Sequence, residues 1–371
     1  MITVDGPRGG VDVKTLDRFT TVLRRGGSGD ESGLPRAYAQ AAPPCTGRRH
    51  AVLALGAAAS ALPVAALAQL VASRRRVGFL SAEAPSDPPQ RERLQRLQVA
   101  LASLGYVEGR NIVYEIRWAE GRYEQLPALA AELVAARVDV IVTSGTKATV
   151  AAHRTTATVP IVMGSTGDPI GWGLTTNLAH PSANVTGWTN FSAELGPKQL
   201  ELLKQASPRT LRTAYLVNPA DRPPWLPMMH ESAKALGLGL DVVEAGAAEQ
   251  LEPAFARIRA SCEAVIIQSD TLFGVKAGAI ARLAIAHRLA SASSLAYYAD
   301  AGGLITYGAD QLEGYRRAAT FVDKLLKGAK PADLAIQGPT LFERVVNLRT
   351  ARALGLEIPR AMILWAQRVI E

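Results

Sequence analysis

From Arg75 onward the sequence alternates between short apolar runs and longer amphipathic segments, and this alternation limits the fold more than any other feature. Its first half predicts strands at 76–81, 111–118, 138–142 and 159–163. Between them, leucine, valine and alanine recur at near-helical spacing, which predicts helices at 91–104, 123–137 and 147–155. Repeated strand–helix units joined by short loops predict a right-handed, parallel, doubly wound α/β sheet.

The same pattern runs a second time after residues 184–190. Further strands are predicted at 213–218, 240–243, 264–270, 304–307 and 343–347, and helices at 196–206, 230–236, 251–261, 275–287 and 315–327. We therefore expect two Rossmann-like α/β lobes with parallel sheets and a ligand cleft between them. The first would span 75–188 with a returning segment around 300–325, and the second 189–298 with part of the tail, 330–371.

The N-terminal region has the pattern of a leader. Residues 1–47 are polar and without periodicity, which predicts disorder and raises the alternative of a misplaced translation start. Arg48-Arg49 and an apolar stretch that ends at Ala68 then predict a signal peptide at 48–68, cleaved before Gln69. The alternative is a membrane anchor, but this Ala-rich segment is marginal for the roughly 20 residues that a span needs. We expect a periplasmic protein, exported by the Sec or the twin-arginine route.

Composition excludes several classes of function. The chain has 371 residues, 48% of them hydrophobic and 20% charged, which is typical of a globular protein. Its net charge of +8 is scattered, with no basic run beyond residues 74–76, so we expect no nucleic-acid partner. Cys262 would be the only thiol after cleavage, and we expect a buried, unreactive side chain rather than a reactive one. The five histidines lack metal-ligand spacing, so neither a metal nor a cofactor is expected.

One stretch, Val138–Thr149, combines a buried strand, a small polar turn and the start of a helix. In an open α/β sheet, ligands bind at the carboxyl ends of such strands and at helix N-termini. Polar residues follow other predicted strands or lie in short loops as well: Ser81, Ser165, Thr166, Asp168, Asn218, Ser269, Asp270, Tyr297 and Tyr298. Two such edges would form a cleft for a small polar molecule with carboxylate or amide groups. The alternative is that these residues only cap helices, as Ser, Thr and Asp commonly do.

Evidence for catalysis is weaker. The Gly145-Thr146-Lys147 run lacks the first glycine and the spacing of a phosphate-binding loop. No Gly-x-Ser-x-Gly elbow is present at a strand-to-helix turn. Asp168 and Asp270 could form a carboxylate pair, but no histidine is adjacent in sequence to either strand end. We therefore expect a binding protein rather than an enzyme. Asp300, which precedes Gly302-Gly303, is expected in a turn.

A resemblance covers nearly the whole chain from Arg75. It is carried by the segments 104–112, 139–146, 159–162, 167–169, 184–187, 198–203, 301–304, 307–308, 315–319, 326–328, 331–334 and 346–348, in the same order. In these the sequence resembles substrate-binding proteins of ABC transporters, in the branch with tryptophan-binding, TrpX-like members. The resemblance implies a type I periplasmic-binding-protein fold: two lobes joined by three crossings that close on a ligand. It also implies a monomer that delivers an amino acid or related carboxylate to a membrane permease and its ATPase.

The resemblance further implies a pocket. Carried over by position, it consists of Ser144, Gly145, Thr146, Ser165, Thr166 and Asp168 from the first lobe, Asn218 and Asp270 from the second, and Thr189 and Asn190 near the first crossing. Asp168 would bind a ligand ammonium or would cap the following turn. Residues 291–296 contain neither proline nor an aromatic residue, where relatives often have a proline and bulkier aromatic residues, which leaves open whether the ligand is aromatic. The alternative function is a ligand-sensing domain of a regulator, which would need a DNA-binding motif before residue 75.

Overall fold

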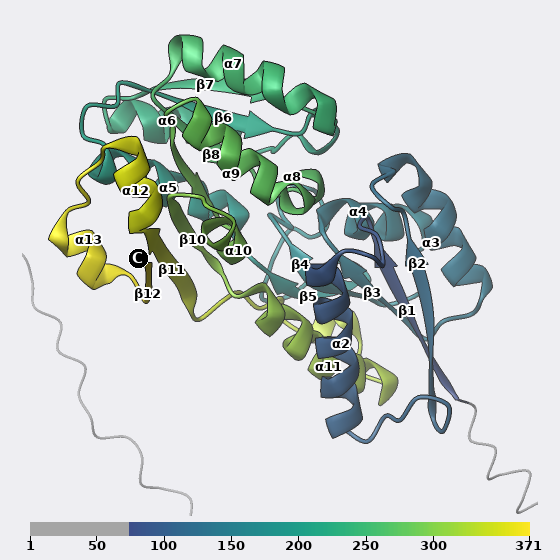
Figure 1. The fold of residues 1–371 in the computed structure, drawn as a ribbon. Helices are drawn as coiled ribbons and strands as arrows, with labels where there is room; N and C mark the ends of the chain where they lie inside the picture. The colour runs from purple at the N-terminus through teal and green to yellow at the C-terminus, as the bar shows by residue number, and fades with distance from the viewer. Residues whose placement is uncertain (1–73) are drawn as a thin grey trace, which may run out of the picture. The chain divides into compact units, whose positions relative to one another are not determined.

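The computed structural model describes residues 74–371 (Figure 1). The predicted leader, the signal peptide and its cleavage position before Gln69 lie outside these residues. No helix in the described part of the chain is long and apolar enough to cross a membrane.

The first sheet contains five parallel strands in the order β2-β1-β3-β4-β5. The strands are β1 (Arg75–Ser81), β2 (Ile112–Trp118), β3 (Val140–Ser144), β4 (Ile161–Thr166) and β5 (Val185–Thr189). The helices that connect them are α2 (Pro88–Ser103), α3 (Leu126–Ala135) and α4 (Thr146–Thr155), with a 3₁₀ turn at Tyr123–Gln125 before α3. Val140, Ile141 and Val142 are fully buried because helices cover both faces of the sheet.

The second sheet contains seven strands in the order β12-β11-β10-β9-β8-β6-β7. They are β6 (Arg212–Val217), β7 (Gly239–Glu244), β8 (Ala264–Ile267), β9 (Ala290–Ser293), β10 (Ile305–Ala309), β11 (Phe342–Asn347) and β12 (Arg368–Ile370). Within this sheet only the pairing of β10 with β11 is antiparallel. The two mainly parallel α/β sheets confirm the predicted fold class.

Nine helices follow β5 in the described chain. They are α5 (Ser192–Ala206), α6 (Leu226–Ala235), α7 (Leu251–Ser261), α8 (Thr271–Val275), α9 (Ala277–Ala286), α10 (Ala296–Asp300), α11 (Gln311–Leu326), α12 (Leu348–Leu354) and α13 (Arg360–Trp365). Short 3₁₀ turns occur at Pro219–Asp221, Ala248–Gln250 and Pro331–Asp333.

Each sheet has a hydrophobic core on both faces. Helices α2 and α11 pack on one face of the first sheet, and α3 and α4 on the other. Helices α5 and α6 share one face of the second sheet with α12 and α13, and α7 and α9 cover the opposite face. We refer to the first sheet with α2, α3, α4 and α11 as the first lobe, and to the second sheet with the remaining helices as the second lobe. Both lobes are thus doubly wound.

Three connections join the two sheets. The chain leaves β5 for α5, which packs on the second sheet, and leaves β10 for α11, which packs on the first. After α11, Gln337 pairs with Trp188 in β5 before the chain enters β11. The segment around 300–325 is therefore divided between the sheets, because β10 lies in the second sheet and α11 on the first.

Several elements differ from the sequence prediction. The helix predicted at 275–287 is α9, and the short helix α8 directly before it was not predicted. The Tyr297-Tyr298 pair lies in α10 rather than in a loop. Asp300 was predicted in a turn but is the last residue of α10, where its carboxylate pairs with Arg368. Strands β5, β9 and β12 and helices α12 and α13 were not predicted. Cys262 is buried and free, as expected.

Candidate ligand-binding site

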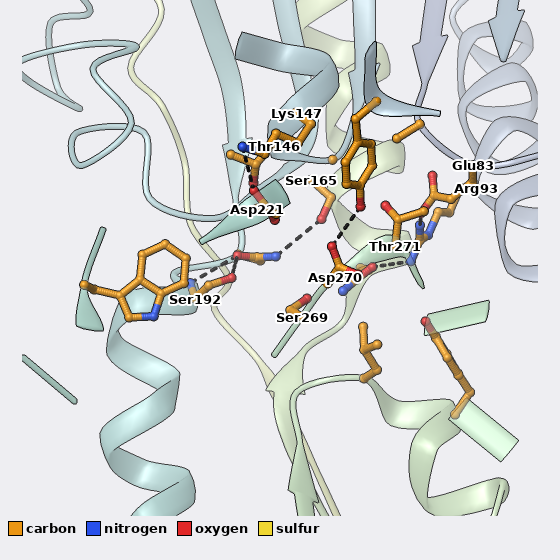
Figure 2. A pocket seen from close by; sticks show the side chains of 18 residues that line it. Glu83, Arg93, Thr146, Lys147, Ser165, Ser192, Asp221, Ser269, Asp270 and Thr271 are labelled. Atoms are coloured by element: carbon orange, nitrogen blue, oxygen red, sulfur yellow. Dashed lines mark hydrogen bonds and ion pairs between the residues drawn. The ribbon is translucent and has the colours of Figure 1, made fainter. Parts of the chain in front are cut away.

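A cavity lies where the carboxyl ends of strands from both sheets meet, and 18 residues line it (Figure 2). The first lobe contributes residues that follow β1, β2 and β3, Ser165 near the end of β4, and Arg93 from α2. The second lobe contributes residues that follow β6, β8 and β9, and Asn190, Ser192 and Gln311 lie at crossings between the sheets. This position at the ends of parallel strands is where open α/β sheets bind ligands.

The start of α4 forms one wall. Gly145 precedes the helix with a φ of 87°, a conformation that glycine adopts without strain, and this turns the chain from β3 into α4. The Thr146 hydroxyl oxygen accepts a hydrogen bond of 3.1 Å from the Gly167 backbone N–H. The first-turn N–H groups of a helix have no partner within the helix, so this wall presents hydrogen-bond donors and the positive end of the helix dipole.

The carboxyl ends of β4 and β5 extend this polar wall. Asn190 uses its amide N–H to reach the Ser165 hydroxyl oxygen at 3.5 Å, and its carbonyl oxygen accepts a hydrogen bond of 2.6 Å from the Ser192 hydroxyl. The hydroxyl oxygens of Ser165 and Thr146 both accept from the protein, and their own protons have no acceptor among residues 74–371. Both hydroxyls can therefore donate to a molecule in the cavity.

Lys147 lies between the lobes. Its ammonium nitrogen is 3.5 Å from a carboxylate oxygen of Asp221, which follows β6 (Figure 2). The same nitrogen is 4.3 Å from the ring centre of Trp172. Burial, together with the nearby charge of Asp270, raises the pKa of Asp221 to about 7, although Lys147 opposes this shift. A buried carboxyl with this pKa exchanges its proton near neutral pH.

Asp270 is buried and hydrogen-bonded on several sides. One carboxylate oxygen accepts from the backbone N–H of Leu272 at 2.8 Å and so caps α8. The other accepts a hydrogen bond of 2.8 Å from the Tyr123 hydroxyl, and the Asn218 amide approaches both oxygens at 3.2 Å. Burial raises the pKa of Asp270, while these hydrogen bonds oppose the shift.

An ion pair between Glu83 and Arg93 forms another side of the cavity. The Arg93 guanidinium donates to Glu83 at 2.8 Å and to Gln311 at 2.5 Å, which ties α2 to the start of α11. Behind this pair, the Ser144 hydroxyl lies 2.7 Å from that of Tyr315 and 3.2 Å from Glu83. This buried network fixes the loop after β1 against both β3 and α11.

Half of the ten predicted site residues line the cavity. These are Gly145, Thr146, Ser165, Asn190 and Asp270. The other five do not line it: Ser144, Thr166, Asp168, Thr189 and Asn218.

The contacts of these five show what they do instead. Ser144 belongs to the buried network just described, and Asn218 holds Asp270. The Thr166 hydroxyl contacts that of Thr149 at 2.9 Å, and the Thr189 hydroxyl donates to the Thr166 carbonyl at 3.0 Å. Asp168 accepts a hydrogen bond of 2.9 Å from the Gly171 N–H. It therefore caps the turn that follows, which is the second of the two roles expected for it.

Several lining residues were not in the predicted set. They include Glu83, Arg93, Tyr123, Lys147, Ser192, Asp221, Trp225 and Tyr297. A signal existed for three of them, since Glu83 and Asp221 lie in polar loops directly after predicted strands and Tyr297 was among the polar residues expected at the cleft. Nothing in the sequence indicated Tyr123 or Trp225, because their place depends on how the two sheets face each other.

The sequence profile of the family of ABC transporter substrate binding proteins matches residues 85–370. This chain belongs to that family. It is 23% identical over 262 residues to a curated tyrosine-binding protein of Clostridioides difficile, a match that covers 70% of this chain and 75% of that protein.

Solved structures show the same fold. An ABC domain from Streptococcus pneumoniae, crystallised with L-Trp, has a TM-score of 0.74 and 22% identity, and the match covers 80% of this chain and 100% of that one. A conserved domain protein from Vibrio cholerae has a TM-score of 0.74 and 23% identity, with 80% and 99% covered. These likenesses confirm the type I periplasmic-binding-protein fold.

Family membership confirms a solute-binding role for the chain. The family is one of binding proteins rather than of enzymes, and its members act outside the cytoplasm. Residues 74–371 contain no cluster of three or more metal-ligating side chains that could hold a metal ion.

Proposed function

We propose that the protein captures an amino acid or a related small carboxylate in the cavity between its lobes and delivers it to a membrane permease and its ATPase. The observation that carries this proposal is the donor wall at the start of α4. There, the hydroxyl protons of Thr146 and Ser165 have no acceptor among the described residues, and the first-turn N–H groups of α4 have no partner within the helix. A carboxylate accepts hydrogen bonds from such donors and is stabilised by the helix dipole.

The opposite side of the cavity supports a ligand with charges of both signs. Asp221 and Asp270 approach from the second lobe, while Lys147 and the polar wall approach from the first. Aromatic rings of Tyr123, Trp225 and Tyr297 also line the cavity and offer apolar surface to a side chain. These rings favour an aromatic ligand even though residues 291–296 contain no aromatic side chain. An aromatic ligand also agrees with two similar proteins, one a tyrosine-binding protein and the other a domain crystallised with L-Trp.

Capture follows from the two-lobe architecture. A ligand held by both lobes contacts all its partners only when the lobes are closed, so its differential affinity shifts the equilibrium toward the closed form. No histidine lines the cavity among the described residues. We propose binding without chemical conversion, which predicts that a bound ligand is recovered unchanged after prolonged incubation.

We further propose that the mature protein is a periplasmic monomer, with its N-terminus at Gln69 after cleavage. Sequencing of the N-terminus from a periplasmic extract tests the location and the cleavage position together. A regulator with a DNA-binding segment would instead keep residues 1–74 and stay in the cytoplasm.

A thermal-shift screen with the twenty L-amino acids, followed by calorimetry, tests the ligand class. Thr146→Ala and Ser165→Ala should each weaken binding of the identified amino acid about five- to tenfold, since each removes one hydrogen bond of about 1 kcal/mol. Ser261→Ala is the matched control, because Ser261 ends α7 and contacts Asp241 away from the cavity. Unchanged affinity in both test variants would contradict the carboxylate wall.

A further inference from the structure

The carboxylate of Asp221 is buried but lacks the hydrogen bonds that a buried carboxylate normally accepts. The residue is 9% exposed, and its Oδ1 atom is fully buried without a hydrogen bond from any residue between 74 and 371. Its nearest cation, Lys147, is 3.5 Å away, longer than the 2.7–2.9 Å typical of a charge-assisted hydrogen bond. Buried carboxylates are normally hydrogen-bonded, because burying them unpaired is costly.

The position of Asp221 is fixed by its backbone rather than by its side chain. Its N–H donates to the Asn218 carbonyl at 2.9 Å, and its own carbonyl accepts a hydrogen bond of 2.7 Å from Gln268. The 3₁₀ turn therefore holds the carboxylate at the cavity wall whether or not the side chain has a partner. Asp270 differs, since the contacts with Tyr123, Asn218 and the start of α8 already satisfy its oxygens.

The charges of the cavity lining do not balance. Glu83 and Arg93 form a close pair, and Lys147 offsets only one of Asp221 and Asp270. With every group ionised, the lining carries one excess negative charge. A zwitterion or a cation is thus tolerated, whereas a dicarboxylate adds like charge to a poorly solvated site.

An acidic hollow adjoins the cavity and shares Glu83, Tyr123 and Thr271 with it. Asp87, Glu120 and Glu124 line this hollow, and no lysine or arginine does so among the described residues. Arg122 pairs with Glu120 at 3.3 Å, which leaves the charges of Asp87 and Glu124. A negative approach to the cavity attracts cationic groups and repels anions.

We propose that Asp221 binds the ammonium group of the ligand and that the site selects ligands by this group. The proposal rests on the proposed function and narrows it to primary amines, with neutral and basic amino acids preferred over acidic ones. The ligand ammonium donates to Asp221 in place of Lys147, whose charge stays over the Trp172 ring. Burial and the charge of Asp270 raise the pKa of Asp221 to about 7, which agrees with a carboxyl that is poorly solvated in the ligand-free site.

The test is a two-by-two comparison by calorimetry at pH 8. It uses the tightest L-amino acid of the thermal-shift screen and its deaminated acid, each against the wild-type protein and Asp221→Asn. In the wild type, removal of the ammonium should weaken binding about ten- to a hundredfold, as expected for a charge-assisted hydrogen bond. In Asp221→Asn the same removal should cost less than about threefold. Asp241→Asn, whose carboxylate pairs with Arg212 away from the cavity, is the control and should behave as the wild type.

The outcomes separate the two proposals. Equal losses in the wild type and in Asp221→Asn would overturn the role of Asp221. Tight binding of the deaminated acid to the wild type would overturn selection by the ammonium and leave the carboxylate wall standing. If no amino acid bound at all, both proposals would fail. Circular dichroism and the unfolding midpoint of Asp221→Asn establish that it is folded, and we expect it to be at least as stable as the wild type at pH 8.

Discussion

The Tyr123 hydroxyl donates a hydrogen bond of 2.8 Å to a carboxylate oxygen of Asp270, and this bond joins the two lobes at the cavity. Tyr123 begins the 3₁₀ turn before α3 of the first lobe, and Asp270 caps α8 of the second. Burial and the Asp270 charge raise the pKa of Tyr123 well above its usual range, so the phenol remains a donor at every physiological pH. The bond forms only when the lobes are together and therefore favours the closed form.

Tyr123→Phe should weaken ligand binding about three- to tenfold, because one interlobe hydrogen bond is worth about 1 kcal/mol. The unfolding temperature without ligand should change little, since Asp270 keeps its other donors. Tyr307→Phe is the control, because Tyr307 stacks on Phe342 in the second lobe and does not line the cavity. Calorimetry with the identified ligand measures both variants, and an equal effect in both would contradict an interlobe role for Tyr123.

The stability of the ligand-free protein should depend on pH through Asp221. Burial raises the pKa of this carboxyl from 3.8 to about 7, so the folded protein keeps a proton that the unfolded chain has released between these values. The stabilisation is fully present below about pH 4 and is lost as the pH rises toward 7. Urea denaturation between about pH 5 and pH 8 should thus show a steeper fall in unfolding free energy for the wild type than for Asp221→Asn. The difference isolates Asp221 from the nearby Lys147, Asp270, Tyr123 and Tyr215.

Ligand binding should have the opposite pH dependence. An ammonium binds the ionised form of Asp221, so affinity should rise from about pH 6 to pH 8 in the wild type and stay nearly flat in Asp221→Asn. At pH 7 the wild type should release a fraction of a proton on binding, which calorimetry in phosphate and in Tris buffer detects as different heats. Identical heats in the two buffers would indicate that the ligand does not contact a titrating carboxyl.

Loss of one partner of the Glu83–Arg93 ion pair should destabilise the folded protein. The two side chains are 11% and 9% exposed, with their atoms 2.8 Å apart. Arg93→Met leaves Glu83 as a buried, unpaired charge, which should lower the unfolding free energy by about 3–5 kcal/mol. Arg91→Met, two residues earlier on the exposed face of α2, should change it by less than about 0.5 kcal/mol. Chemical denaturation compares them, and similar values would contradict the structural role of this pair.

Close packing of α11 on the first sheet predicts a contrast between two glycines. A Cβ at Gly314 would lie 2.2 Å from the Gly164 carbonyl oxygen and 2.6 Å from the Trp188 ring, so Gly314→Ala should destabilise by about 1–3 kcal/mol. Gly278→Ala in α9 meets only the flexible end of Arg282 at 3.6 Å. It should raise the unfolding temperature, because alanine favours a helix by up to about 1 kcal/mol. A stable Gly314→Ala protein would contradict the packing of α11.

Most strands of the fold were predictable because their burial is visible locally. Runs such as residues 138–142 are apolar and β-branched, and strands of this kind lie inside parallel sheets. Strand β9 escaped prediction because Ala290–Ser293 consists of small residues, two of them serines, that are buried between β8 and β10. Strand β5 contains Gly187, whose φ of 123° brings the backbone against Met163. In both strands the neighbours in the sheet decide the structure, not the local propensity.

Site residues could be predicted only where their position depends on a single strand and its carboxyl end. Thr146 and Ser165 line the cavity because the carboxyl ends of parallel strands, and the helices that start there, share one edge of the sheet. Ser144 precedes the turn, and its side chain lies on the face toward Tyr315. Lys147 was considered only as part of a phosphate loop, whereas its contacts with Asp221 and Trp172 span 74 and 25 residues of sequence. Contacts of this length depend on tertiary structure that no local pattern contains.

Native mass spectrometry of the freshly purified protein tests the central claim most directly. If the cavity captures an amino acid, the spectrum should show one bound molecule with the mass of an amino acid. The fraction carrying it should fall in Thr146→Ala and Asp221→Asn and should persist in Asp241→Asn. A bound molecule without a carboxylate, or equal occupancy in all these variants, would contradict the claim that this cavity is an amino-acid site.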